Sequence, residues 1–204
     1  MAAHNLVGLG FTSAPASIAP AGGSKPVIGT NPFSLATPDG KGAVSMLIDQ
    51  SSSVIAKSEL VKRNNAGESI PEGWALDANG QPTTDPAAGL QGSMVPIAGY
   101  KGVGIGPLVE VMAAVLSGAV LGLNASPFAG TAGGPPNTGQ LFIAIDPDKL
   151  SGQQFYASME TLLNSITEQQ GTMIHGSNRL AQRAYHDTHG VAVNNILLEK
   201  ITSA

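Results

Sequence analysis

Glycine and proline divide this chain into short apolar segments, and this pattern limits its possible folds more than any other feature. The 204 residues include 26 glycines and 14 prolines. Much of the glycine lies in clusters between the apolar segments. Because glycine adopts backbone conformations that other residues avoid, the clusters predict many turns and close backbone approaches. The length favours one domain, or one large domain with a small appendage.

The composition excludes several classes of protein. A hydrophobic fraction of 42% with only 12% charged residues indicates a globular chain. The net charge is −4 and no run of Lys or Arg stands out, so no nucleic-acid partner is expected. The absence of cysteine excludes disulfides, thiolate nucleophiles and cysteine-based metal sites. The first residues lack the pattern of a signal peptide, so we expect a cytoplasmic protein.

Three apolar segments predict buried strands at residues 6–12, 43–49 and 140–146. Helices are predicted at residues 57–65, after an N-cap at Ser151, and at residues 178–188 before Gly190. Strands and helices alternate loosely. The expected fold class is therefore α/β in the mixed α+β sense, with a mixed sheet flanked by helices.

The most apolar stretch, residues 107–123, predicts a buried helix. Leu108, Val111, Met112 and Val115 have the spacing of one helical face, and Val109 and Leu116 widen this face until burial almost all round is expected. The stretch carries Glu110 and is short for a bilayer, so no membrane anchor is expected.

A glycine-rich turn at residues 99–106 precedes this helix and includes Tyr100, Lys101 and Gly102. Free backbone N–H groups and a lysine at such a place favour an anion such as phosphate. The turn lacks the Gly-Lys-Ser/Thr order of a Walker A loop, and it is not the GxGxxG turn that follows a Rossmann strand. The alternative is that these glycines only allow the helix to pack closely.

Asp49 and the serines Ser51, Ser52 and Ser53 follow a predicted strand. A carboxylate beside hydroxyls and unpaired N–H groups could hold a ribose or a phosphate. The alternative is a strand-end turn capped by Asp49.

No other pattern indicates chemistry. The histidines are His4, His175, His186 and His189, and none lies in a recognisable site. No spacing of His, Asp and Glu indicates a metal, and no GxSxG motif indicates a serine hydrolase.

Several segments taken in order resemble the malate/L-lactate dehydrogenase family, which is unrelated to Rossmann dehydrogenases. The matching stretches are GTNPF at residues 29–33, DQSSS at 49–53, IPEGWA at 70–75, TTDP at 83–86, GYKG at 99–102 and GQLFIAID at 139–146. The DQSSS run and the stretch at residues 92–102 look more like the Δ1-piperideine-2-carboxylate and Δ1-pyrroline-2-carboxylate reductases of this family than like its malate or ureidoglycolate enzymes.

The resemblance implies an oxidoreductase that uses NADH or NADPH to reduce a 2-oxo acid or a cyclic 2-imino acid, usually as a homodimer. It implies a non-Rossmann NAD(P)-binding domain at residues 1–175 and a helical segment at 176–204 that packs with an N-terminal domain. It places the cofactor at three segments, and their members are Asp49, Ser51, Ser52, Ser53, Tyr100, Lys101, Gly102, Gly176, Ser177 and Asn178.

Two departures from the family pattern affect the expected function. Ser13, Ala14 and His175 stand where the family has other residues, so local contacts there differ. Members also carry a catalytic histidine in a segment ahead of the first strand, and this chain begins just before that strand. We therefore expect a truncated chain without a catalytic residue, and His4 does not replace the missing acid. The alternative function is a fragment that binds a dinucleotide or a partner without turnover.

Overall fold

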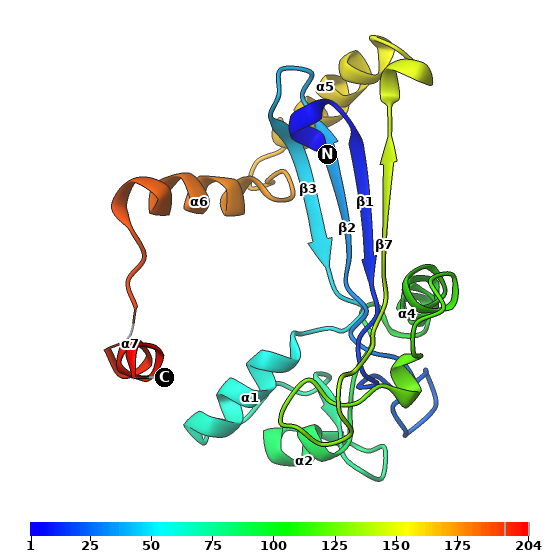
Figure 1. Cartoon of the computed structure of the whole chain (residues 1–204), viewed down its shortest axis with the longest axis vertical. Coiled ribbons are helices and arrows are strands. Elements are labelled where there is room, and N and C mark those ends of the chain that lie inside the picture. Colours follow the sequence, from blue (N-terminus) through cyan, green and yellow to red (C-terminus); the bar gives the residue numbers. More distant parts are fainter. Residues whose placement is uncertain (194, 204) are drawn as a thin grey trace. The chain divides into compact units, whose positions relative to one another are not determined.

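The computed structural model describes residues 1–193 and 195–203. The chain divides into two compact units, Met1–Gly152 and Gln153–Ala204. Residues 194 and 204, which fall in the predicted helical segment 176–204, lie outside the described residues. The expected combination of helices and sheets is confirmed (Figure 1).

The first unit is built on a four-stranded sheet with the order β3-β2-β1-β7. Its strands are β1 (Val7–Thr12), β2 (Phe33–Pro38), β3 (Val44–Gln50) and β7 (Gln140–Ile145). The three predicted strands are confirmed as β1, β3 and β7, and β2 was not predicted. All three strand pairs are antiparallel. The one parallel pairing among the described residues is an isolated bridge between Ile18 and Met94.

The strands are less buried than their apolar sequences predict. In β7 the residues alternate between exposed and half-buried, and Phe142 is 60% exposed. In β3 the apolar residues are half-buried and the last two residues are exposed. The prediction of fully buried strands was wrong because β3 and β7 are the outer strands of the sheet, and an antiparallel sheet buries alternate residues.

The hydrophobic core lies beyond the end of this sheet, around a small second sheet and two helices (Figure 1). The small sheet has the order β5-β4-β6. Its strands and the helices beside it are β4 (Ala75–Leu76), β5 (Pro82–Thr83), β6 (Ser93–Met94), α1 (Lys57–Ala66) and α2 (Pro86–Gln91). The core residues are Ile18, Ile28, Leu60, Ile70, Ala75 and Met94.

Two aspartates of this region have local structural roles. Asp77 Oδ1 accepts hydrogen bonds from the backbone N–H groups of Asn79 and Gln81, which closes the β4–β5 turn. Asp85 Oδ1 accepts from the Ala87 N–H and caps α2, and Pro86 occupies the first helical position. The TTDP motif is therefore a helix start.

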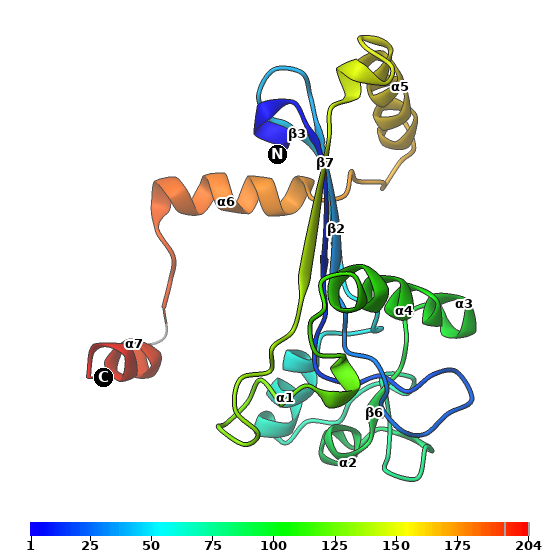
Figure 2. The same cartoon turned by 45° about the vertical axis from the view of Figure 1, so that its right-hand side comes forward.

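Helical structure follows from α3 (Gly99–Val103) through α4 (Ile105–Glu110) into a π-helical segment, η2 (Val111–Val115). Figure 2 shows α3 and α4 towards the same end of the sheet as α1 and α2. A buried helix was predicted here, but the predicted face was wrong: Leu108, Val111 and Val115 are 55%, 47% and 56% exposed.

The buried face of this helix carries small residues and Val109. Val109, Ala113 and Ala114 are fully buried. A methyl group on Gly139 would overlap the Ala113 carbonyl oxygen, so the chain entering β7 passes directly against the alanine face. Apolar periodicity alone could not distinguish this face, because alanine and glycine allow closer packing than leucine does.

The second unit is helical. It contains α5 (Gln154–Thr167), α6 (Ser177–His189) and α7 (Asn195–Thr202). The N-cap of α5 is Gln153 rather than the predicted Ser151, since residues 151–153 form a turn after the short helix η4 (Pro147–Lys149). The predicted helix before Gly190 is confirmed as α6. Two further short 3-10 helices in the first unit are η1 (Ala2–His4) and η3 (Gly122–Asn124). Among the described residues no helix has the length and apolar character needed to cross a membrane.

Candidate functional site

The serine run leaves the end of β3 and turns inward. Asp49 is exposed and Ser51 is half-buried, whereas Ser52 and Ser53 are only 1% and 3% exposed. Ser53 Oγ donates to the Ile55 carbonyl oxygen at 2.7 Å and lies 3.0 Å from Ser51 Oγ. The hydroxyls of this run are therefore bonded to one another and to the backbone.

Hydrogen bonds join the serine run to the chain that leads into α3. The Ile97 N–H donates to the Ser52 carbonyl oxygen at 2.9 Å, and the Val54 N–H donates to the Val95 carbonyl oxygen at 3.0 Å. Ser53 and Pro96 form a β-bridge. The structure thus joins the serine run to residues 95–97, the segment that leads into the glycine-rich turn at residues 99–106.

Gly102 has a packing role that only glycine can fill. A methyl group there would overlap the Ile97 carbonyl oxygen. A methyl group on Gly106, one turn later, would overlap the Ile28 side chain and lie 3.8 Å from Ser52 Cβ. Close packing at these glycines places α3 against Ile97 and α4 against Ile28 and Ser52. The packing role is therefore supported for both glycines, and the anion-binding role stays a prediction.

Four residues of the two predicted segments on either side of this junction have exposed or half-buried side chains: Asp49, Ser51, Tyr100 and Lys101. We call them the candidate cofactor edge. Lys101 is exposed and Tyr100 is 75% exposed. The candidate cofactor edge therefore comprises a carboxylate, a hydroxyl, an aromatic ring and an ammonium group, whereas Ser52, Ser53 and Gly102 are buried.

Behind the edge lies a buried group of polar side chains that we call the polar hub: Asn31, Ser52 and Glu110. Asn31 is fully buried and Glu110 is 8% exposed. Ser52 Oγ donates to the Asn31 carbonyl oxygen at 3.0 Å, and the Ser52 N–H donates to the Thr30 carbonyl oxygen at 2.7 Å. Ser52 thus fastens the end of β3 to the GTNPF segment.

The side chain of Asn31 makes three hydrogen bonds within the hub. Its Nδ2 donates to Glu110 Oε2 at 2.7 Å and to the Gly106 carbonyl oxygen at 3.0 Å, and its Oδ1 accepts from the Ala14 N–H at 3.0 Å. Glu110 Oε1 accepts from the Gly122 N–H at 2.6 Å. Every polar atom of the two side chains has a partner, as burial requires.

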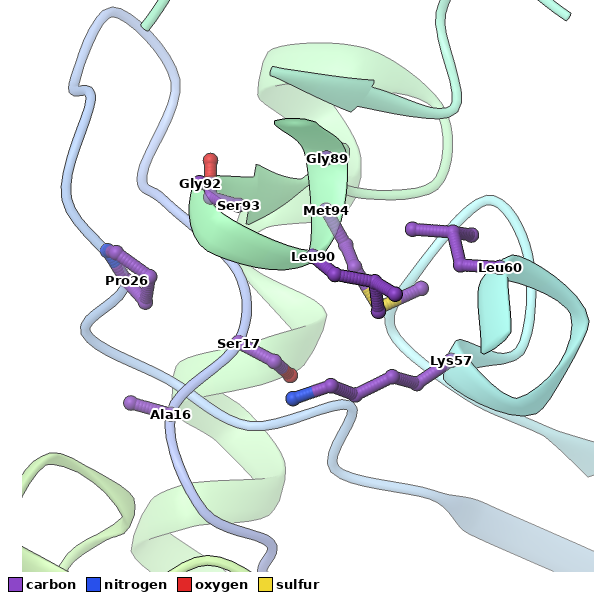
Figure 3. Close-up of a pocket in the computed structure, with 10 residues that line it drawn as sticks. All are labelled: Ala16, Ser17, Pro26, Lys57, Leu60, Gly89, Leu90, Gly92, Ser93 and Met94. Carbon is purple, nitrogen blue, oxygen red and sulfur yellow. The ribbon is translucent and has the colours of Figure 1, made fainter. Parts of the chain in front are cut away.

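A small cavity of about 100 Å³ lies next to this junction, between α1, α2 and β6 (Figure 3). Figure 3 shows the Lys57 side chain extended along the cavity with its ammonium end towards the Ser17 hydroxyl. Ser17 is 7% exposed. Lys57 is also the first residue of α1, whose N-cap residue Ala56 provides no side-chain hydrogen bond. A cation, a hydroxyl and a helix start thus come together here.

The third predicted cofactor segment belongs to the second unit. Gly176 has φ 86° and is the N-cap of α6, and Ser177 and Asn178 are exposed in the first turn of that helix. The sequence interpretation of a loop followed by a polar helix is confirmed there. The role of these three residues in cofactor binding stays a prediction.

The histidines of α6 are bonded within that helix end. His186 Nδ1 lies 2.9 Å from the Gly190 carbonyl oxygen, and His189 Nδ1 lies 2.9 Å from the Tyr185 carbonyl oxygen. The His189 ring stacks on Tyr185 with 4.2 Å between ring centres. Across the described residues, no group of three His, Asp or Glu side chains is arranged to hold a metal ion.

Sequence reasoning missed the hub and the cavity. Glu110 was noted only as a charge in an apolar stretch, yet a lone carboxylate in a predicted buried helix is itself a signal for a bonded, buried acid. Asn31 has φ 38°, a left-handed conformation in which Asn is common among non-glycine residues, but nothing in the sequence shows that conformation. Lys57 and Ser17 are 40 residues apart, and only the fold brings them together.

Comparison with known protein families gives one family for nearly the whole chain. The profile of the malate/L-lactate dehydrogenase family matches residues 1–202. A (2R)-3-sulfolactate dehydrogenase (NADP(+)) of Chromohalobacter salexigens is 41% identical over 183 residues, which are 90% of this chain and 54% of that protein. A Δ1-pyrroline-2-carboxylate reductase of Pseudomonas fluorescens is 36% identical over 203 residues, which are 98% of this chain and 60% of that protein.

Solved structures agree with the sequence relatives. The Δ1-piperideine-2-carboxylate reductase of Pseudomonas syringae has a TM-score of 0.89 and 30% identity, covering 99% of this chain and 61% of that one. The sulfolactate dehydrogenase of Methanocaldococcus jannaschii has a TM-score of 0.82 and 28% identity, covering 96% of this chain and 57% of that one. The chain thus spans between half and two thirds of the length of each of these proteins.

Proposed function

The chain belongs to the malate/L-lactate dehydrogenase family, and on that premise we propose that it is the NAD(P)-binding part of an oxidoreductase acting on a 2-oxo acid or a cyclic 2-imino acid. The observation that carries the proposal is the hydrogen-bonded junction between the serine run and residues 95–97, which lead into α3. This junction supports the proposal that two of the three predicted cofactor segments share one edge. Residues 1–175 would form the NAD(P)-binding domain, and residues 176–204 would pack with an N-terminal domain.

The chemistry of the candidate cofactor edge fits a dinucleotide. The Asp49 carboxylate can accept hydrogen bonds from ribose hydroxyls, and the exposed Lys101 ammonium can pair with a phosphate. The exposed Tyr100 ring offers a face for stacking. When bound, the reduced nicotinamide of NADH or NADPH supplies a hydride to C2 of the substrate, and the oxygen or nitrogen on C2 takes up a proton.

Ser52, Ser53 and Gly102 would act behind the edge rather than on the cofactor. The hydroxyl protons of Ser52 and Ser53 are both donated to backbone carbonyl oxygens. Gly102 is held against Ile97. We therefore assign direct contact to Asp49, Ser51, Tyr100 and Lys101, together with the predicted Gly176, Ser177 and Asn178 of the second unit.

The cavity beside Lys57 suits the acid group of the substrate. Relatives of the chain are named for sulfolactate and for Δ1-pyrroline-2-carboxylate, both of which are small carboxylates. The Lys57 ammonium, the Ser17 hydroxyl and the uncapped start of α1 all favour an anion. Both kinds of substrate remain within this proposal.

Two assays test the proposed function. Titration of the 204-residue chain with NADH and with NADPH should show saturable binding, and absence of binding to either would reject the proposal. Lys57→Ala should weaken binding of sulfolactate or Δ1-pyrroline-2-carboxylate to the dinucleotide complex, with dinucleotide affinity unchanged. Lys62→Ala on the same helix, where the side chain is 75% exposed, is the matched control.

A second candidate function is dinucleotide binding without turnover. It is favoured by the position of the histidines, since the first unit has one histidine, His4, and no histidine lines the cavity. Incubation of the chain with NADPH and a panel of 2-oxo and cyclic 2-imino acids distinguishes the two. Steady NADPH oxidation would reject this second candidate, and tight binding with no oxidation would support it. A homodimer and a cytoplasmic location remain expectations from the family.

A further inference from the structure

Glu110 is a buried carboxylate that the proposed chemistry does not use. It is 8% exposed, and its oxygens accept hydrogen bonds from Asn31 Nδ2 and from the Gly122 N–H. No salt bridge to Glu110 occurs in the part of the chain that the structure describes. Burying a carboxylate without a cation is costly, so an apolar side chain would serve mere packing better.

The hydrogen bonds of Glu110 connect segments that are far apart in sequence. On one side Glu110 holds Gly122 at η3, and on the other it holds Asn31 in the GTNPF segment. Asn31 in turn bonds the Ala14 N–H and the Gly106 carbonyl oxygen. The carboxylate therefore fixes the position of Asn31 relative to the helix that begins with α3.

The path from Asn31 leads to the candidate cofactor edge in two further hydrogen bonds. Ser52 Oγ donates to the Asn31 carbonyl oxygen, and the Ile97 N–H donates to the Ser52 carbonyl oxygen. Ile97 lies three residues before Tyr100, and Ser52 lies beside Ser51. Both halves of the edge thus depend on the backbone position of Ser52.

We propose that Glu110 is a positioning residue for the dinucleotide site: through Asn31 and Ser52 it fixes the serine run against α3. It touches neither cofactor nor substrate in this assignment. The inference rests on the proposed function for its link to the dinucleotide, and on the hydrogen-bond path alone for its link to Ser52 and Ile97.

The test replaces the carboxylate with an amide of nearly the same shape. In Glu110→Gln one oxygen becomes an NH2 group, so a donor faces either Asn31 Nδ2 or the Gly122 N–H and one bond is lost. We expect faster hydrogen exchange at the Ser52 and Ile97 amides, which Glu110 does not contact, and about a tenfold rise in the Kd for NADPH. Glu160→Gln, at an exposed position of α5, is the control and should change neither.

A second variant protects the test against simple misfolding. In the double variant Asn31→Asp/Glu110→Gln, the amide at position 110 can donate to the carboxylate at position 31, so the hydrogen bond between the two side chains can form again. The Gly106 carbonyl oxygen loses its donor in this variant. We expect partial recovery of the exchange rates at the Ser52 and Ile97 amides and of the Kd for NADPH. Wild-type exchange at Ser52 and Ile97 in Glu110→Gln, or an equal rise at every amide, would overturn the proposal. Failure of the wild-type chain to bind NADPH would reject the proposed function instead, because the exchange measurement needs no ligand.

Discussion

The polar hub and the candidate cofactor edge meet at adjacent residues, Ser52 and Ser51, but their physical environments are opposite. In the hub, Asn31 and Ser52 are at most 1% exposed, and their side chains are bonded to fixed partners. At the edge, Tyr100 is 75% exposed and Lys101 is also exposed. One short motif can therefore serve two purposes: in DQSSS, Ser52 and Ser53 are buried in the scaffold, whereas Asp49 and Ser51 are the residues that we propose contact a ligand.

The largest expected effect comes from breaking the contact between the two regions. Gly102→Ala should lower the free energy of unfolding by about 3 kcal/mol, because its new methyl group overlaps the Ile97 carbonyl oxygen. Gly104→Ala is the matched control. A methyl group there would lie 3.7 Å from the Lys101 carbonyl oxygen, an ordinary contact, and φ is −62°, so a gain of about 0.5–1 kcal/mol is expected. Chemical denaturation measures the free energy of unfolding of both variants, and equal stability of the two would contradict the packing role of Gly102.

Substitution of the adjacent residues Ser52 and Ser51 compares one residue of the polar hub with one residue of the candidate cofactor edge. Ser52→Ala removes the donor to the Asn31 carbonyl oxygen and should cost about 1 kcal/mol of stability. Ser51→Ala removes a half-buried hydroxyl bonded only to Ser53, so a smaller loss of stability is expected. Thermal unfolding of the two variants checks this order, and a greater loss in Ser51→Ala would reverse the assignment.

At the edge itself the expected effect is on affinity. Lys101→Ala should raise the Kd for NADPH by about tenfold without changing the melting temperature, because an exposed ammonium contributes to an anion rather than to the fold. Lys41→Ala, at an exposed position of the β2–β3 turn, controls for the loss of one positive charge. Equal affinity of Lys101→Ala and the wild type would remove Lys101 from the site.

The smallest effect is expected at the far end of β3, at the turn from β2. Hydrogen bonds from the Ala43 and Lys41 N–H groups lower the pKa of Asp39 below its ordinary value of 3.8. Because the folded-state pKa is the lower one, this stabilisation is present above the unfolded-state pKa and is lost as pH falls through the folded-state pKa. Thermal unfolding between about pH 5 and 2 should therefore show a steeper loss for the wild type than for Asp39→Asn. Parallel curves would contradict the role of this turn.

Periodicity and turn residues were enough to predict several of the regular elements, although not β2. The predictions at residues 6–12, 43–49, 140–146 and 57–65 correspond to β1, β3, β7 and α1, because apolar runs and helical spacing are local properties of the sequence. Burial was predicted poorly at Leu108 and Val115, since which face is covered depends on the neighbouring chain at Gly139 rather than on the helix itself.

The candidate site could likewise be predicted only in part from the sequence. Asp49 and Lys101 could be proposed from sequence because their residue types suit a nucleotide, and Tyr100 because of the family resemblance. Glu110 and Lys57 were not, because their partners Asn31 and Ser17 are 79 and 40 residues away in the chain. The division of DQSSS into scaffold and edge residues also needed the structure, since serine has the same chemistry at all three positions.

Hydrogen exchange of the 204-residue chain, with and without saturating NADPH, tests the central assignment most directly. If the serine run and α3 form one dinucleotide edge, NADPH should slow exchange at residues 49–54 and 97–102 together. Amides of the outer strand β7, away from this junction, should keep their rates. Protection that appears elsewhere in the first unit while both of these segments exchange unchanged would contradict the account.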